Sequence, residues 1–147
     1  MKQQIVIVGA TSAIAVSCAR LWVEAGEKAF VLIGRDRERL GRVADDLKVR
    51  SPGSEVCLLV ADFCNPEEIA AVVKQASLVP PDIVLIAHGM LPDQAACELD
   101  LHACQQALEI NAVSPVLFAE GFVQVLLKNS RGVLAIIGSV AGDRGRE

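Results

Sequence analysis

The stretch G-A-T-S-A-I-A at residues 9–15 follows an apolar run and opens a segment with helical periodicity. Gly9 permits a tight turn, and the free N–H groups of a helix beginning behind it offer positive charge to a diphosphate. Ala13 and Ala15 replace two glycines that are usual in such loops, which affects phosphate approach at 13 and helix–strand packing at 15. We expect a dinucleotide to contact Gly9, Thr11, Ser12, Ala13 and Ile14. The alternative is an ordinary turn capped by Thr11 or Ser12.

A basic loop, G-R-D-R at residues 34–37, follows the next apolar run. In a dinucleotide-binding sheet an acidic residue here binds the ribose 2′-hydroxyl of NAD, whereas arginine suits the 2′-phosphate of NADP. Arg35 follows Ala15 at about the separation that this fold uses, and Arg37 could join it on the phosphate. The pattern predicts NADP(H) in preference to NAD(H). The alternative is a solvated basic helix start, which the helix dipole slightly disfavours.

Three further apolar runs are each followed by residues that could contact a ligand. They are Asp62 and Phe63, then Ala87, His88 and Gly89, and finally Ser139. Asp62 could bind an adenine edge together with the next backbone N–H, or it could be a cap or turn residue. His88 would overhang a crevice, and a loop histidine without a role is its alternative. Ser139 could polarise a carbonyl oxygen, or it could simply turn the chain.

These loops share one position, because each comes directly after a predicted strand. Apolar runs predict strands at residues 5–8, 29–33, 56–61, 83–87 and 133–137. Helical periodicity predicts helices from about 12 to 25, from Asp36 as N-cap, and from Asn65, which proline and two acids follow. The alternation predicts one domain over residues 1–147, with a doubly wound parallel sheet and helices on both faces. We expect this sheet to be Rossmann-like, with the strand order 3-2-1-4-5 of that fold. Ligands of such sheets bind beyond the carboxyl ends of the strands.

Residues 93–129 are expected to form two helices, with the break at Ser114-Pro115, because proline inside a helix costs roughly 3 kcal/mol. The second helix has one narrow polar stripe and is apolar almost all round, so we expect it to be buried. One face of a sheet is not enough to cover it. We therefore expect a partner helix or a second subunit, and a homo-oligomer formed through the helices around 95–128.

Composition narrows the function classes. The 147 residues are 52% hydrophobic, and the net charge of 14 − 18 = −4 comes without a basic block, so nucleic-acid binding is disfavoured. Five cysteines without a C-x-x-C pair indicate reduced thiols, and we expect no metal site. No uninterrupted apolar run reaches the roughly 18 residues that span a bilayer, and the apolar start fits a strand better than a signal peptide. We expect a cytoplasmic protein without a membrane partner.

The motifs together resemble the N-terminal part of a short-chain dehydrogenase/reductase. The matching pieces occur in the family's order and cover the whole chain: G-A-T-S-A-I-A, L-I-G-R-D-R-E-R-L, A-D-F-C-N-P-E-E-I, I-N-A-V-S-P-V and G-V-L-A-I-I-G-S-V-A-G. The resemblance implies that Arg35 selects NADP(H) and that Asp62 meets the adenine with Phe63 beside it. It further implies that Asn111 supports a proton relay and that Ser139 is the catalytic serine. The family's Asn-Asn-Ala-Gly is matched only by its glycine, at residues 86–89.

The resemblance also implies a proton-donating tyrosine in a Tyr-x-x-x-Lys motif, and this chain contains no tyrosine. We expect the motif beyond residue 147 of a longer protein, together with a further helix and two strands, and we expect the 147 residues alone to be inactive. The predicted activity is hydride transfer between a nicotinamide and a small carbonyl or alcohol substrate. The alternative is a non-catalytic NADP(H)-binding sensor or scaffold. A flavodoxin- or receiver-like domain is disfavoured, because the first strand ends without acidic residues.

Overall fold

The protein folds around one parallel sheet in the computed structural model, which describes residues 1–139 and leaves 140–147 outside the described part. The strands lie in the order β3-β2-β1-β4-β5. Their bounds are β1 Gln3–Val8, β2 Lys28–Gly34, β3 Glu55–Val60, β4 Ile83–Ile86 and β5 Val133–Ile136. The predicted fold class and strand order are confirmed, and only the limits of the strands differ slightly.

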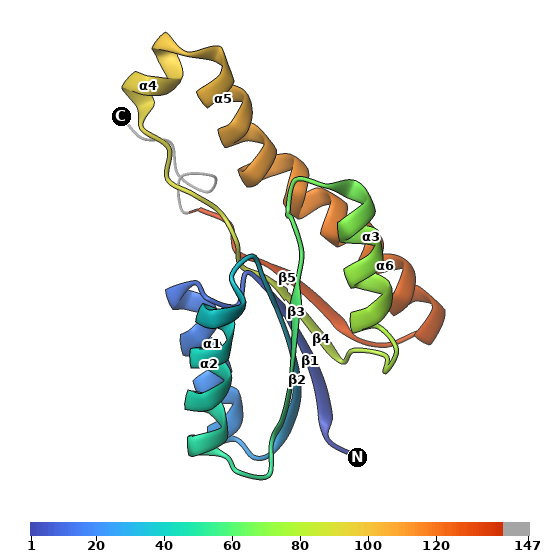
Figure 1. Cartoon of the computed structure of the whole chain (residues 1–147). Coiled ribbons are helices and arrows are strands. Elements are labelled where there is room, and N and C mark those ends of the chain that lie inside the picture. The colour runs from blue at the N-terminus through green and yellow to red at the C-terminus, as the bar shows by residue number, and fades with distance from the viewer. Residues whose placement is uncertain (140–147) are drawn as a thin grey trace.

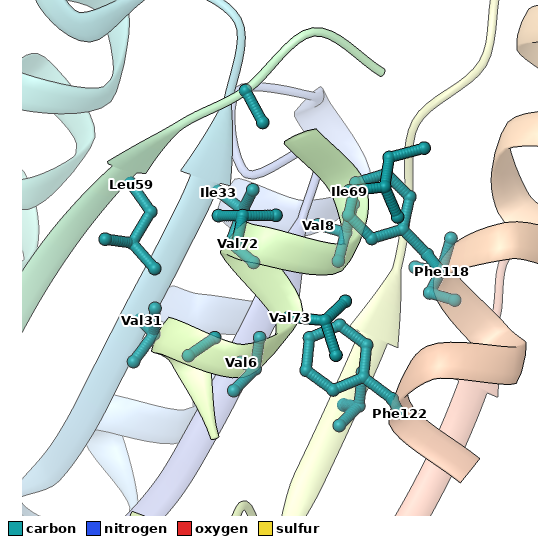
Figure 2. Close-up of a cluster of buried hydrophobic side chains, with 14 of the residues drawn as sticks. Val6, Val8, Val31, Ile33, Leu59, Ile69, Val72, Val73, Phe118 and Phe122 are labelled. Atoms are coloured by element: carbon teal, nitrogen blue, oxygen red, sulfur yellow. The ribbon is translucent and has the colours of Figure 1, made fainter. Parts of the chain in front are cut away.

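Helices cover both faces of the sheet (Figure 1). On one side lie α1 (Ala13–Glu24) and α2 (Arg37–Arg50), and on the other lie α3 (Pro66–Ala76) and α6 (Ser114–Asn129). The central strand β1 serves both layers, because successive side chains of a strand point to opposite faces. Val6 and Val8 pack under α3 and α6 (Figure 2), whereas Ile5 and Ile7 pack under α1 and α2. Four consecutive side chains of β1 are thus fully buried, which fixes the strand in the middle of the domain.

Side-chain caps begin the first three helices directly after their strands. Ser12 Oγ accepts a hydrogen bond from Ala15 N at 3.2 Å, and Asp36 Oδ1 accepts one from Arg39 N at 3.0 Å. Asn65 caps α3 in the same way. These caps satisfy N–H groups that a helix start leaves without a partner. The predicted caps at Asp36 and Asn65 are confirmed.

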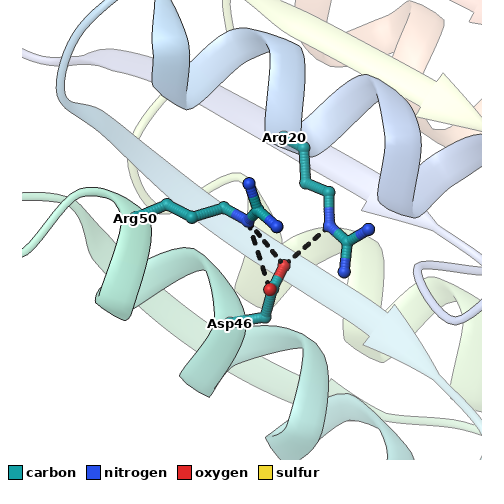
Figure 3. A network of polar contacts seen from close by, with 3 residues as sticks. All are labelled: Arg20, Asp46 and Arg50. Atoms are coloured by element: carbon teal, nitrogen blue, oxygen red, sulfur yellow. Dashed lines mark hydrogen bonds and ion pairs between the residues drawn. The ribbon is translucent and has the colours of Figure 1, made fainter.

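A carboxylate joins α1 to α2 at the surface (Figure 3). Asp46 of α2 accepts from Arg20 of α1 at 2.8 Å and from Arg50 one turn further along α2 at 3.1 Å. The hydrogen bond from Arg20 is the main cause that lowers the pKa of Asp46, and Arg50 adds to it. Surface ion pairs contribute little stability, so the network mainly fixes how the two helices lie beside each other.

The predicted break at Ser114-Pro115 is wrong. After the short helix α4 (Gln94–Leu99), the chain breaks at Asp100 and then stays helical from Leu101 to Asn129. This helix consists of α5 (Leu101–Leu108), a π-helical turn over Glu109–Val113, and α6. Pro115 has no N–H to donate and would clash with a carbonyl one turn back. The wider π turn accommodates both effects, so the helix continues.

The expectation that one face of the sheet is not enough to cover α6 is confirmed. Phe118 and Phe122 are fully buried against the sheet and α3, but Val116 and Leu127 are 58% and 67% exposed. The reason is geometric: α3 and the sheet cover only one side of the helix. By length and composition alone, the continuous helix Leu101–Asn129 could also cross a membrane. Its buried phenylalanines show that its second half forms part of the α/β core.

Candidate functional site

A cavity of about 180 Å³ lies at the carboxyl edge of the sheet, where the strand order reverses between β1 and β4. Segments far apart in the sequence line it: the loops after β1, β2, β3 and β4, the start of α2, and the π turn. The lining residues are Gly9, Thr11, Ser12, Gly34, Arg35, Arg39, Phe63, His88, Gly89 and Ile110. Seven of the predicted cofactor residues are therefore brought together. Open parallel sheets bind their ligands in this position.

The turn after β1 requires glycine at position 9. Gly9 has φ +76°, and its N–H donates to Ile33 O at 2.9 Å, which ties the turn to β2. A Cβ at this position would lie 2.6 Å from the Cβ of His88, closer than real contacts allow. The loop after β4 therefore presses directly on the turn after β1. Such close packing of two loops fits a site in which backbone N–H groups face a diphosphate.

The two alanines of the first loop occupy different surroundings. Ala15 is fully buried in the hydrophobic cluster under α1 and α2, so its methyl group is part of the core. Ala13 and Ile14 are exposed in the first turn of α1 and do not line the cavity. Thr11 and Ser12 are half-buried and do line it. Of the loop residues predicted to bind a cofactor, Gly9, Thr11 and Ser12 are therefore the best placed.

The arginines after β2 divide into two that line the cavity and one that does not. Arg35 and Arg39 line it, whereas Arg37 is exposed outside it. Arg39 was missed by the sequence reasoning, although a signal was present. Asp36 is the N-cap, which makes Arg39 the third residue of α2, and helical side chains point back toward the N-terminus.

His88 stands in the wall of the cavity as a neutral residue. Burial, with a smaller contribution from the positive charge of Arg35, lowers its pKa from 6.5 to about 4. Its Nε2 lies 2.9 Å from Ser114 Oγ, and its ring forms T-shaped contacts with Phe63 and Phe118 at centroid distances of 4.7 and 5.5 Å. Among the described residues, its buried Nδ1 has no hydrogen-bond partner. The contact with Ser114 had no signal in the sequence.

Three more of the predicted cofactor residues, Ala87, Asp62 and Phe63, lie in the loops after β4 and β3. Ala87 is buried, and its N–H donates to Val8 O at 2.8 Å, which extends the pairing of β4 with β1 beyond the strand. Asp62 does not line the cavity. Its carboxylate accepts from Cys64 N at 2.9 Å, which makes it a turn residue in this structure. Phe63, the next residue, is buried and does line the cavity.

Asn111 belongs to the π turn and clamps the chain that leaves β4. Its Oδ1 accepts from Met90 N at 2.7 Å, and its Nδ2 donates to Met90 O at 2.8 Å. Ser139 follows β5 and is exposed at the end of the described residues. Ile137 N, two residues earlier, donates to Ile86 O at 2.9 Å, so β5 delivers Ser139 to the same edge of the sheet as the loop after β4. Both residues predicted to be catalytic thus lie at the edge that carries the cavity.

Within residues 1–139, no three His, Cys, Asp or Glu side chains gather where a metal ion could be held. The residues that line the cavity offer backbone N–H groups, hydroxyls, two guanidinium groups and one neutral imidazole. These groups suit an anionic nucleotide, because they offer donors and positive charge at a helix N-terminus.

The sequence model of the family described as "short chain dehydrogenase" matches residues 3–147. The chain belongs to this family. A relative is dehydrogenase/reductase SDR family member 7B of Bos taurus, which is 26% identical over 144 residues and is matched by 94% of this chain and 44% of its own length. This short-chain dehydrogenase chain thus spans about half the length of the curated relatives that it matches.

Solved structures share the fold of this chain. An actinorhodin polyketide ketoreductase with NADPH is 22% identical with a TM-score of 0.86, covering 99% of this chain and 56% of its own. A 7α-hydroxysteroid dehydrogenase complexed with NADH and 7-oxo glycochenodeoxycholic acid is 21% identical with a TM-score of 0.84, covering 98% and 56%. At this identity the likeness establishes the Rossmann-like fold.

Proposed function

We propose that this short-chain dehydrogenase is an NADP(H)-dependent oxidoreductase that interconverts a small carbonyl compound and its alcohol. The observation that carries the proposal is the cavity in which the Gly9 turn, the start of α1 and two arginines meet. Two structural neighbours are described with NADPH and NADH, which supports a nicotinamide cofactor of one kind or the other. The arginines support NADP(H), because a 2′-phosphate needs a positive partner and a ribose hydroxyl does not.

In this proposal, different residues of the chain bind the cofactor and position the substrate. The turn at Gly9 and the backbone around Thr11 and Ser12 bind the diphosphate, and Arg35 binds the 2′-phosphate. When bound, the nicotinamide supplies or accepts the hydride at the substrate carbon. Ser139 holds the substrate oxygen by a hydrogen bond, and Asn111 keeps the π turn and the loop after β4 in register beside it.

The proton for the substrate oxygen is assigned to a tyrosine of a Tyr-x-x-x-Lys segment beyond residue 147, in keeping with the family resemblance. The lysine and the ribose hydroxyls would lower the pKa of that tyrosine. This assignment makes the catalytic proposal depend on the complete protein. A complete protein without the Tyr and Lys pair would rule out this mechanism.

The cofactor assignment is tested by binding. We expect NADPH to raise the melting temperature of the complete protein more than NADH at equal concentration, since a ligand at a hundredfold its Kd adds about 2.7 kcal/mol of stability. Arg35→Ala should remove most of this difference. Equal shifts for both cofactors, or a preference that survives in the variant, would refute the NADP(H) assignment.

The reaction is tested by turnover of the complete protein against a panel of ketones and aldehydes, followed by the loss of NADPH absorbance. Ser139→Ala should lower kcat by about 10²–10³-fold, the usual effect of removing a donor from a developing oxyanion. NADPH binding without consumption of any carbonyl substrate would instead identify a non-catalytic binding protein.

The proposed assembly is a homo-oligomer formed through α5 and α6. The exposed apolar side chains along this helix are Leu101, Leu108, Val113, Val116 and Leu127. The core leaves all five uncovered, and we infer that they belong to one apolar interface, since large exposed apolar patches usually mark an interaction site.

A further inference from the structure

We propose that Arg39, rather than Arg37, is the second residue that selects NADP(H), and that it binds the 2′-phosphate together with Arg35. This inference rests on the proposed function and names the residue that gives it its cofactor specificity. Arg35 and Arg39 both line the cavity that also contains the Gly9 turn and the start of α1, and Arg37 does not.

The backbone of α2 explains why Arg39 is the one that faces the site. Asp36 caps the helix by accepting from Arg39 N at 3.0 Å, so the backbone of this residue is held at the helix start. A helical side chain leans toward the N-terminus, which here is the loop that ends β2 and carries Arg35. Arg37, the first helical residue, lies two residues earlier and therefore on nearly the opposite side of the helix, and it does not line the cavity.

The nearby acidic side chains are engaged elsewhere. The carboxylate of Glu38 pairs with Arg42 at the next turn of α2, and Asp46 pairs with Arg20 and Arg50 on the side that faces α1. Asp36 uses Oδ1 for the helix cap. Within residues 1–139, neither Arg35 nor Arg39 forms an ion pair.

Neither guanidinium group has a carboxylate partner in the cavity, so both are available to a doubly charged anion. A phosphate monoester carries nearly two negative charges at pH 7 and offers oxygens that match the fork of N–H donors on each arginine. A ribose hydroxyl is neutral and needs at most one such donor. The pair of arginines therefore favours the phosphorylated cofactor by charge and by geometry.

The experiment compares two alanine variants of the complete protein, Arg39→Ala and Arg37→Ala, by isothermal titration calorimetry with NADPH and NADH. The two positions are close in sequence, both exposed and both in the first turn of α2, so Arg37→Ala is a matched control. Thermal melts without ligand confirm that both variants fold. We expect Arg39→Ala to weaken NADPH binding by at least tenfold and NADH binding by less than twofold, with Arg37→Ala changing neither by more than twofold.

Adenosine 2′,5′-bisphosphate and adenosine 5′-monophosphate serve as probes for the phosphate alone, since neither carries the nicotinamide. The Arg39→Ala variant should lose affinity for the first and keep it for the second. Equal losses for NADPH and NADH would overturn the inference, and so would a loss in Arg37→Ala as large as in Arg39→Ala. If the unsubstituted protein binds both cofactors equally, the NADP(H) assignment fails as well. If it prefers NADPH and Arg39→Ala retains that preference, only the role of Arg39 fails.

Discussion

Gly9 is constrained twice, by its own backbone and by its neighbour. A φ of +76° is a conformation that residues with a side chain rarely adopt, and the Cβ of His88 occupies the space that a side chain would need. Of the three glycines usual in such a loop, this chain keeps the one that cannot be replaced. The other two positions are helical, and there alanine is accepted.

We predict that Gly9→Ala destabilises the protein by at least about 2 kcal/mol, because it adds left-handed strain and a steric clash. Gly41→Ala is the matched control. Gly41 lies within α2 and nothing approaches its Cβ position within 4 Å, so the same substitution should stabilise by about 0.5–1 kcal/mol. Urea unfolding measures both, and similar effects in the two variants would contradict the role assigned to Gly9.

His88 makes stability depend on pH. The folded protein leaves this histidine unprotonated down to a pKa of about 4, whereas the unfolded chain binds a proton below its ordinary pKa of 6.5. Unfolding therefore takes up a proton between these values, and the free energy of unfolding falls as the pH drops from 6.5 to 4. We expect His88 to account for a loss of roughly 2 kcal/mol, less than the full effect because part of the ring faces solvent.

The measurement is urea unfolding between pH 7 and 4.5, with His88→Gln flattening the curve and His102→Gln, at an exposed position of α5, leaving it unchanged. An NMR titration of the folded protein gives the same information without a substitution at position 88. A midpoint for His88 near 6.5 would show that the ring is not held neutral by its surroundings.

At the scale of the elements, the π turn is the feature that connects the long helix to the sheet. It allows the chain to pass Pro115 without a break, and it presents Asn111 to the chain leaving β4. A regular α-helix would rotate the side chains of α5 relative to α6, so the turn decides which side of the helix meets the sheet. A side-chain hydrogen bond also joins two other elements, since Asp46 of α2 accepts from Arg20 of α1.

We predict that Asn111→Ala loosens the loop after β4, because it removes both hydrogen bonds to Met90. Global stability should fall by only about 1 kcal/mol, since both bonds are exposed, but exchange of the Met90 N–H should become about tenfold faster. Asn129→Ala is the control, because the Asn129 side chain donates to Val125 O within α6 and not to the loop after β4. Unchanged exchange at Met90 in Asn111→Ala would contradict the clamp.

At the scale of the whole molecule, the helices on the two faces of the sheet differ in how many large apolar side chains they expose. Helices α1 and α2 expose three large apolar side chains, Ile14, Leu21 and Val49, whereas α5, the π turn and α6 expose five, Leu101, Leu108, Val113, Val116 and Leu127. Strand β5 is one of the two edge strands of the described sheet, and Val133 and Ile136 are 58% and 52% exposed on it. The continuous helix from α5 to α6 thus carries more exposed large apolar side chains than α1 and α2 together.

We predict that Val116→Asp disrupts self-association, because it places a charge in the middle of the proposed interface, where desolvation is costly. Val49→Asp is the control, since Val49 is 82% exposed on α2, away from this surface. Sedimentation of the complete protein should show the first variant dissociating at concentrations at least tenfold higher than the control. A protein that is monomeric without any substitution would remove this proposal.

The sequence by itself determined the sheet, because buried strands, capping residues and helical periodicity are local signals. Five apolar runs, the caps Asp36 and Asn65, and the turn at Gly9 were enough to predict a parallel sheet with helices on both faces and to place the predicted ligand-contacting residues at one edge. Local signals also carried the family resemblance, since its motifs are short and lie directly after strands.

Only the tertiary structure decided which of these residues share a cavity. Arg39, and not the predicted Arg37, lines the cavity. Asp62 was predicted to contact the cofactor, but its carboxylate accepts a hydrogen bond in its own turn. His88, which follows β4, contacts Ser114 at the start of α6. The sequence also did not predict that the helix continues through Pro115, because a single π-helical turn is too short to produce a recognisable hydrophobic pattern. Each outcome depends on how side chains from distant segments pack against one another, and local sequence patterns contain no information about those distances.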